Sequence, residues 1–203
     1  MKSYPSIPTT IRADVPIYAF DKLDGSQIRA VWAPKSGFVN FGTRTRALES
    51  SHPWLGEAIT LIRDKYEAGL TRVLAAGKVQ RATVYFEFFG PGSFAGRHRP
   101  EPHDVVLLDV DRFGRGLVPP DEFLASFGHL HVPRLLHRGL ADAAFVAAVR
   151  EGALPGLSGE GVVCKSTALE RRQPVFFKIK TRAWLARLRE RCAGDEALFE
   201  ALA

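Results

Sequence analysis

The sequence predicts a mixed α+β fold, and two observations lead to that prediction. Short runs of β-branched and aromatic residues recur between turn residues, and other stretches show the apolar spacing of helices. The 203 residues, 46% hydrophobic and 25% charged, suffice for one soluble globular domain. We expect this domain to span residues 1–181 and a helical tail, residues 182–203, to pack on it.

Strands are expected where apolar β-formers lie between Gly, Pro, Asn, Asp or Ser residues. The runs that fit are Ile17–Phe20, Gln27–Trp32, Phe38–Phe41, Thr83–Phe89, Val105–Val110, Gly161–Lys165 and Val175–Lys180. Helices are expected where apolar residues recur every three or four positions, or where a proline pair opens a short segment. These segments are Trp54–Leu70, Pro120–Phe127, Ala141–Arg150 and Arg182–Ala203.

Composition limits the classes of function. The formal net charge of +6 favours a polyanionic partner, with nucleic acid first, although a merely basic soluble protein would look the same. Only two cysteines occur, Cys164 and Cys192, which argues against a disulfide framework or a cysteine-based zinc site. No apolar run could span a membrane, and Met1–Pro5 lacks the apolar core of a signal peptide. We therefore expect a cytoplasmic protein with no membrane partner.

Charged residues on two of the predicted strands need an explanation. Alternation places Lys178 and Lys180 on one face of their strand, opposite an apolar face. They form either a lysine-protected edge strand facing water or a cationic wall for phosphates. Glu87 lies between aromatic residues and is costly to bury without a partner. It faces water, or it holds a hydroxyl group, a cation or a metal.

A second carboxylate and a lysine complete the candidate set. Glu160 begins a strand after a flexible Pro/Gly-rich stretch and is either a surface acid or a ligand for Mg²⁺. Lys22-Leu23-Asp24-Gly25 follows the first strand and is either an ordinary turn or a nucleophilic amine on a tight turn. A nucleophilic lysine must be neutral, and nearby Lys178 and Lys180 would lower its pKa. Its attack on a nucleotide would give a phosphoramidate and release pyrophosphate.

The order KLDG, YFEFFG, EGVVCK and FKIK, from Lys22 to Lys180, resembles the covalent nucleotidyltransferases. These are the ATP-dependent DNA and RNA ligases and the RNA-capping guanylyltransferases. The resemblance implies that Lys22 is the residue that becomes adenylylated, within a motif that includes Asp24. It further implies a ribose contact for Glu87, a metal-associated role for Glu160, and α-phosphate contacts for the lysine pair Lys178 and Lys180.

Other positions place the resemblance nearest to RNA ligases of the RNA ligase 2 kind. Gln27 stands where many DNA ligases and capping enzymes carry arginine, and Asp109 resembles the aspartate of an RNA ligase strand. Aliphatic residues flank Asp109, so an aliphatic residue or another aromatic, such as Phe89, is expected to pack the base. Residues 181–203 leave no room for a five-stranded OB barrel. The implied fold is a ligase-type nucleotidyltransferase domain in which two mainly antiparallel sheets flank a nucleotide cleft, with peripheral helices and no OB domain.

The implied activity is that of an ATP-dependent RNA ligase using Mg²⁺ or Mn²⁺. It would join RNA 5′-phosphate and 3′-hydroxyl ends through lysyl-AMP and an adenylylated RNA end, in RNA repair, with end-healing enzymes as candidate partners. Arg44 and Arg46 could contact the RNA end or form a solvated turn. His98 and His103 lie in a Pro/Arg-rich loop that is either surface or RNA-contacting. The alternatives are a DNA ligase, a capping-type enzyme, or a non-catalytic domain that binds nucleotide or RNA.

Overall fold

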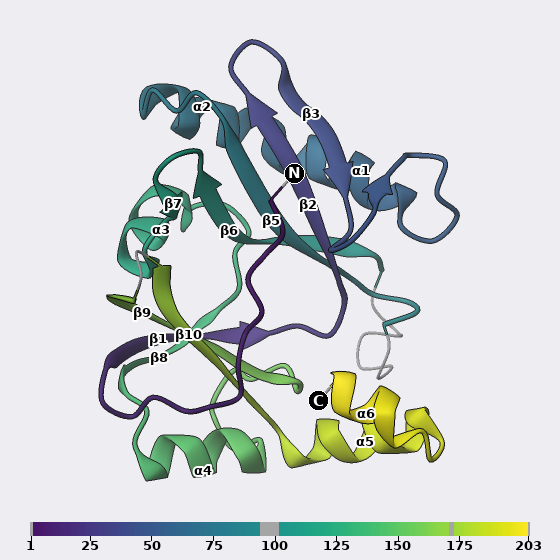
Figure 1. The fold of residues 1–203 in the computed structure, drawn as a ribbon, viewed down its shortest axis with the longest axis vertical. Coiled ribbons are helices and arrows are strands. Elements are labelled where there is room, and N and C mark those ends of the chain that lie inside the picture. Colours follow the sequence, from purple (N-terminus) through teal and green to yellow (C-terminus); the bar gives the residue numbers. More distant parts are fainter. Residues whose placement is uncertain (1, 94–101, 171–172, 203) are drawn as a thin grey trace.

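The computed structural model describes residues 2–93, 102–170 and 173–202 (Figure 1). Two antiparallel sheets form the body of this part of the chain. One sheet has six strands in the order β4-β3-β2-β5-β6-β7, and the other has four in the order β10-β9-β1-β8. The expectation of an α+β fold with two mainly antiparallel sheets is therefore confirmed.

The six-stranded sheet is built mostly from consecutive hairpins. Its strands are β2 (Ser26–Ala33), β3 (Gly37–Gly42), β4 (Ala47–Leu48), β5 (Ala82–Phe89), β6 (Asp104–Arg112) and β7 (Gly116–Leu117). The four-stranded sheet instead joins distant parts of the sequence. Its strands are β1 (Pro16–Lys22), β8 (Leu135–Leu140), β9 (Gly161–Glu170) and β10 (Gln173–Lys180). Because β1 lies between β8 and β9, the start of the chain is central to a sheet made largely from its second half.

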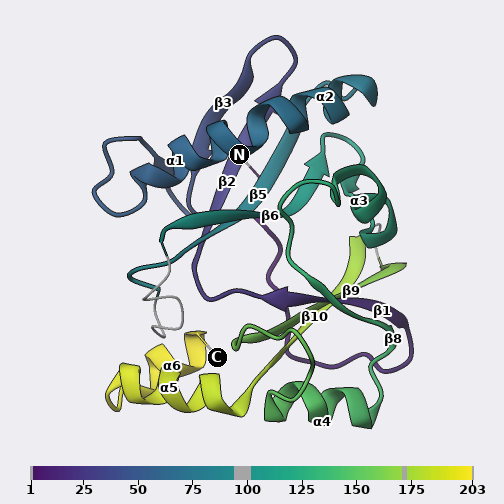
Figure 2. The ribbon, with the colours of Figure 1, turned by 180° about the vertical axis from the view of Figure 1, so that it is seen from behind.

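Helices pack against both sheets. They are α1 (Gly56–Ile62), the π-helical turn η1 (Arg63–Glu67), α2 (Ala68–Ala76), α3 (Pro120–Phe127), α4 (Ala143–Glu151), α5 (Arg182–Cys192) and α6 (Glu196–Leu202). In Figure 2, α1 and α2 lie across the six-stranded sheet on the side away from the other sheet. α4 packs on the four-stranded sheet through Phe145 and Val149. None of the helices in the described ranges has the length and apolarity needed to cross a membrane.

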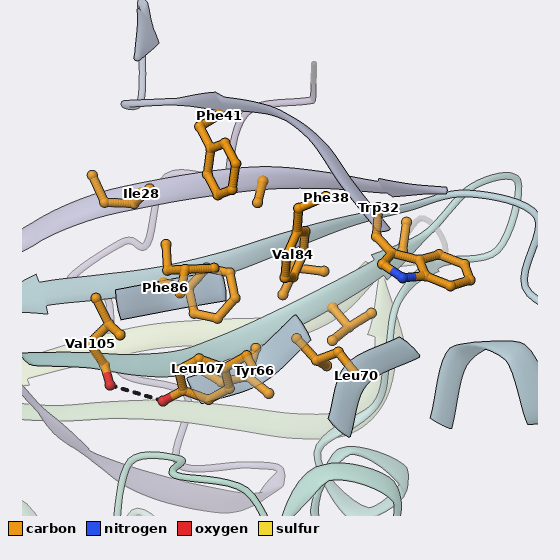
Figure 3. Close-up of a cluster of buried hydrophobic side chains, with 14 of the residues drawn as sticks. Ile28, Trp32, Phe38, Phe41, Tyr66, Leu70, Val84, Phe86, Val105 and Leu107 are labelled. Atoms are coloured by element: carbon orange, nitrogen blue, oxygen red, sulfur yellow. Dashed lines mark hydrogen bonds between the residues drawn. The ribbon is translucent and has the colours of Figure 1, made fainter. Parts of the chain in front are cut away.

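The main hydrophobic core lies between the six-stranded sheet and the helices α1, η1 and α2 (Figure 3). Its largest side chains come from alternate positions of β2 and β5, such as Trp32 and Phe86, which are fully buried. The hydroxyl of Tyr66, on the π-helical turn, donates a hydrogen bond of 2.9 Å to the carbonyl of Val105. This core occupies the helix-facing side of the sheet, so the opposite side is left to face the four-stranded sheet.

Two helices and three strands differ from the sequence expectation, and two of these strands are the short β4 and β7, which were not expected. The helix expected over Arg182–Ala203 is two helices, because Ala193 and Gly194 adopt left-handed φ angles of 49° and 90° and break it. The helix expected over Trp54–Leu70 starts at Gly56 and continues through η1 to Ala76. Strand β8 was not expected, since its exposed and half-buried side chains lack an apolar alternation; it forms by pairing with β1.

The N-terminal segment, residues 2–8, crosses from one sheet to the other (Figure 1). At the six-stranded sheet, Lys2 forms an ion pair of 2.6 Å with Asp111, and the Tyr4 hydroxyl donates a hydrogen bond to Asp109. At the four-stranded sheet, the Lys178 N–H donates a hydrogen bond of 2.9 Å to the carbonyl of Pro8. The segment therefore links the two sheets across the space between them.

Candidate active site

A cleft of about 240 Å³ lies between the two sheets, with walls from β1, β2, β5, β6, β9 and β10. Four of its lining residues are cations: Lys22, Lys178, Arg44 and Lys165. Its polar wall includes Gln27 and Glu87. Its apolar lining includes Ile7, Phe20, Leu108, Pro133 and Val163. One cleft thus combines cations suited to phosphates, polar side chains and an apolar surface.

Lys22 is the last residue of β1 and is held beside a buried carboxylate. Its Nζ lies 2.8 Å from Oε1 of Glu160, which is 3% exposed as a residue. The Nζ of Lys180 lies 3.4 Å from the same oxygen. Lys22, Glu160 and Lys180, which are up to 158 positions apart in sequence, therefore form one charged cluster.

Backbone geometry brings these three side chains together. Gly161 pairs with Lys22 on one side and with Lys180 on the other, so β9 places Glu160 between them. Gly161 has φ of 148°, and a Cβ on it would come within 2.1 Å of the Ile179 carbonyl oxygen. Only glycine fits this approach. The Thr181 N–H also donates a hydrogen bond of 2.9 Å to the Glu160 carbonyl, which fixes the acid at the strand end.

The polar wall follows from the pairing of β2 with β5. Gln27 lies opposite Glu87 in this register, so both side chains point to the same face. The turn between β1 and β2 is tight, because a Cβ on Gly25 would lie 2.3 Å from the Phe88 carbonyl oxygen. The buried Oε1 of Gln27 has no hydrogen-bond partner within the described residues. It is an acceptor available to a ligand in the cleft.

The charge state of Lys22 differs from the sequence expectation. Burial disfavours its ammonium form, but the carboxylates of Glu160 and Glu87 outweigh burial and raise the pKa of Lys22. The expected lowering of the Lys22 pKa by Lys178 and Lys180 was therefore wrong. Sequence alternation identifies the two cations but not the acid that stands closer to Lys22.

The two lysines of β10 show the opposite shift. Burial, joined by the positive charge of Lys22, lowers the pKa of both Lys178 and Lys180, and that of Lys180 falls to about 8. Lys180 also lies over the Trp184 ring at 3.9 Å and donates a hydrogen bond of 2.5 Å to the Leu202 carbonyl. Lys180 is therefore held by α5 and α6 as well as by Glu160.

Glu87 gives a testable pH dependence. Burial raises its pKa from 4.5 to about 8, and nearby Glu160 and Asp24 add to the effect while Lys22 opposes it. A raised carboxyl pKa contributes stability that is complete below about 4.5 and is lost as pH rises through about 8. Between pH 5 and 9, thermal unfolding of the wild type should lose stability relative to Glu87→Gln. Parallel curves for the two proteins would contradict the assignment.

A buried ion pair at the cleft wall was not foreseen from the sequence. The Nζ of Lys165 lies 2.7 Å from Oδ2 of Asp109 and donates a hydrogen bond of 2.9 Å to the Leu108 carbonyl. The side chains of Lys165 and Asp109 are 5% and 1% exposed. Tyr4 donates a further hydrogen bond to Asp109. Lys165 falls in the EGVVCK string, which was the available signal, but its partner is 56 positions away.

The remaining candidates are distributed as follows. Asp24 is buried in the turn after Lys22, and its charge acts on both Lys22 and Glu87. Arg44 lines the cleft, whereas Arg46 is exposed and is not among the cleft residues. Phe89 is not among the residues that line the cleft, where Phe20, Leu108 and Val163 contribute to the apolar wall. Which residue packs a base stays a prediction. His98 lies outside the described residues.

Comparison with solved structures supports the fold. An archaeal ATP-dependent RNA ligase matches with a TM-score of 0.64 and 17% identity, over 94% of this chain and 51% of that one. A Naegleria gruberi RNA ligase with PPi matches with a TM-score of 0.63 and 15% identity, over 87% and 52%. A variant of that ligase, solved with ATP and Mn, gives 0.62 and 15%, over 85% and 51%. The chain thus spans about half the length of these proteins and shares their fold.

Comparison at the level of sequence gives the family. No curated protein matches the chain. The model of the RNA ligase family matches residues 15–180, which contain Lys22, Glu87, Glu160 and both lysines of β10. Since that match covers most of the 203 residues, the chain belongs to the RNA ligase family.

Proposed function

We propose that this protein is an ATP-dependent RNA ligase that joins RNA 5′-phosphate and 3′-hydroxyl ends through a lysyl-AMP intermediate on Lys22. The observation that carries the proposal is the position of Lys22, which is ion-paired with Glu160 at 2.8 Å and lines a cleft shared with Lys178 and Arg44. Residues 1–181 would form the nucleotidyltransferase domain, and residues 182–203 would pack on it through Lys180.

The cleft suits a nucleoside triphosphate in three respects. The apolar wall can pack the faces of a base, and the cations can neutralise phosphates. The unpartnered Oε1 of Gln27 can accept a hydrogen bond from a ribose hydroxyl or a base amino group. Glu87, whose pKa is raised to about 8, can hold a ribose hydroxyl as either donor or acceptor.

Protein side chains would supply only some of the ligands of a divalent cation at this site. The described residues contain no group of three or more His, Cys, Asp or Glu side chains placed to hold a metal ion. Mg²⁺ is commonly bound by one or two carboxylates together with substrate phosphates and water. Glu160 is the residue that would hold it, and a bound Mg²⁺ or Mn²⁺ would neutralise phosphate charge. The related Naegleria ligase solved with ATP and Mn supports this assignment.

The chain's own residues would prepare Lys22 for attack. Its ammonium must lose a proton before Nζ can form a bond to the α-phosphorus, from which pyrophosphate leaves. Contact with Glu160 keeps that proton in the nucleotide-free protein. Once Glu160 no longer faces Lys22, the positive charges of Lys178 and Lys180 would lower the pKa of Lys22. The same two lysines would stabilise the charge that develops on the α-phosphate.

Two later steps would complete sealing. The adenylyl group would pass from Lys22 to the RNA 5′-phosphate, and the 3′-hydroxyl of the second end would then displace AMP. Arg44, beside Lys178 in the cleft lining, is placed to contact an RNA phosphate. We place this chemistry in RNA repair in the cytoplasm, with end-healing enzymes as partners.

The proposal is tested by intact mass measurement after incubation with ATP and Mg²⁺. The protein should gain the mass of one adenylyl group, and peptide mapping should locate it on Lys22. GTP in place of ATP tests the capping-type alternative, and nicked RNA against nicked DNA tests the DNA ligase alternative. An unchanged mass with every nucleotide would contradict the proposal and favour a non-catalytic binding domain.

A further inference from the structure

A second, larger hollow lies beside the turn that follows Lys22. Its volume is about 730 Å³, and its lining includes Gly25, Ser26 and Phe88, together with Trp54. Gln27 and Glu87 face the nucleotide cleft, so their neighbours Ser26 and Phe88 face the other side of the sheet. The two hollows therefore lie on opposite faces of the sheet, and the turn through Gly25 forms the rim between them. We call the second one the Trp54 groove.

Trp54 is presented to solvent on a fixed piece of backbone. It is 80% exposed, whereas the other two tryptophans, Trp32 and Trp184, are 0% and 3% exposed. The Nδ1 of His52 accepts hydrogen bonds from the Trp54 and Leu55 N–H groups, at 3.3 and 3.2 Å. The carbonyl of His52 accepts a third, 2.9 Å long, from Gly56. An exposed indole on an ordered turn is a ready surface for stacking.

The rest of the groove is aromatic and has balanced charge. The His103 ring lies 4.8 Å from that of Phe88. Its nitrogens contact Glu57 Oε2 at 2.6 Å and the Pro91 carbonyl at 2.8 Å. Because both partners are acceptors, both ring nitrogens donate, and the charge of the imidazolium is matched by Glu57. Such a surface suits the flat face of an uncharged base better than a phosphate.

We propose that the Trp54 groove binds an unpaired nucleobase of the RNA end that is being sealed, by stacking the base on Trp54. The inference rests on the proposed function and adds a substrate site to it. The cations Lys22, Lys178 and Arg44 lie in the adjoining cleft and would hold the phosphates of the same strand. Phosphate contacts on one side of the rim and a base platform on the other are the two components of single-strand recognition.

The groove selects single-stranded RNA ends on physical grounds. Bases inside a duplex are already stacked on their neighbours and cannot lie on a protein indole, whereas unpaired bases can. Stacking tolerates any base, because every base has a π face. The Trp54 groove therefore adds affinity for unpaired ends without adding a preference for sequence.

The test is anisotropy of a fluorescent, 5′-phosphorylated single-stranded RNA, titrated with protein in the absence of ATP. Trp54→Leu should weaken binding by about tenfold, as expected for the loss of one stacked base. Trp54→Phe should restore most of the affinity, since it keeps an aromatic face. Phe113→Leu is the matched control, because Phe113 is 77% exposed in the β6–β7 turn, and it should bind as the wild type does. A blunt RNA duplex should not distinguish Trp54→Leu from the wild type.

Intrinsic fluorescence gives a second readout. RNA should quench the emission of the wild type, and the quenching should disappear in Trp54→Leu, where only the two buried tryptophans remain. Equal RNA affinity of Trp54→Leu and the wild type would overturn the inference. So would a change in oligomeric state of Trp54→Leu with unchanged RNA affinity, which would make the groove a protein contact. Neither measurement needs ATP. Failure of RNA binding at the Trp54 groove can therefore be distinguished from failure of Lys22 adenylylation.

Discussion

Lys22→Ala should abolish the adenylyl adduct formed with ATP, yet leave sealing of a pre-adenylylated RNA end measurable. The amine of Lys22 forms the bond to the α-phosphate. Among the described residues, Lys22 is the one lysine that both pairs with Glu160 and lines the cleft. Loss of a nucleophile typically costs at least about a thousandfold in rate. The last step uses an RNA end that already carries AMP, so it does not require a free amine at position 22.

Two measurements make this prediction decisive. Intact mass spectrometry follows the adduct, and denaturing gels follow the joining of pre-adenylylated RNA. Lys35→Ala is the matched control, because it removes an equal charge from an exposed lysine outside the cleft lining. An adduct on the Lys22→Ala protein would place the nucleophile elsewhere and would refute the mechanism.

Asp109→Asn should lower the free energy of unfolding by about 3–5 kcal/mol, because it leaves a buried ammonium without a counter-charge. The Lys165 side chain is 5% exposed, and its Nζ lies 2.7 Å from Asp109. Burial raises the pKa of Asp109, and the positive charge of Lys165 opposes that rise. For a protein of this size, the loss corresponds to a decrease in Tm of roughly 10 °C.

A double variant separates the ion pair from simple loss of packing. Replacing both partners together, with Asp109→Leu and Lys165→Met, removes both charges and should recover much of the stability lost in the single variant. Calorimetry of the three proteins measures the effect, and Asp64→Asn, on the exposed side of the π-helical turn, is the control. If Asp109→Asn unfolds at the wild-type temperature, the pair contributes little to stability.

Much of the candidate site was predictable because its motifs sit on strands with clear alternation. The apolar residues on either side of Lys178 in β10 do enter the core on the opposite face; they are Phe177 and Ile179. β10 is the edge of its sheet, but its lysines do not face water: Lys180 is buried and Lys178 lines the cleft. Glu87 was assigned to one face of its strand by the same alternation, and that face does line the cleft; its pairing with Gln27 joins residues 60 positions apart and was not predicted.

The unpredicted parts depend on contacts between distant residues. The raised pKa of Lys22 comes from Glu160, which reaches it only through the pairing of β1 with β9. The partner of Lys165 lies in the other sheet, and no periodicity reports such a pair. Strand β8 forms because β1 offers it an edge, not because its own side chains alternate.

The place of β1 in its sheet also affects when the protein can react during synthesis. A ribosome delivers Lys22 well before its neighbours Glu160 and Lys180, which follow it by 138 and 158 positions. Until β9 is made, β1 can pair only with β8, and pairing across so many residues is intrinsically slow. Under the proposed function, we expect a nascent chain to take up AMP only after it has been synthesised through β10.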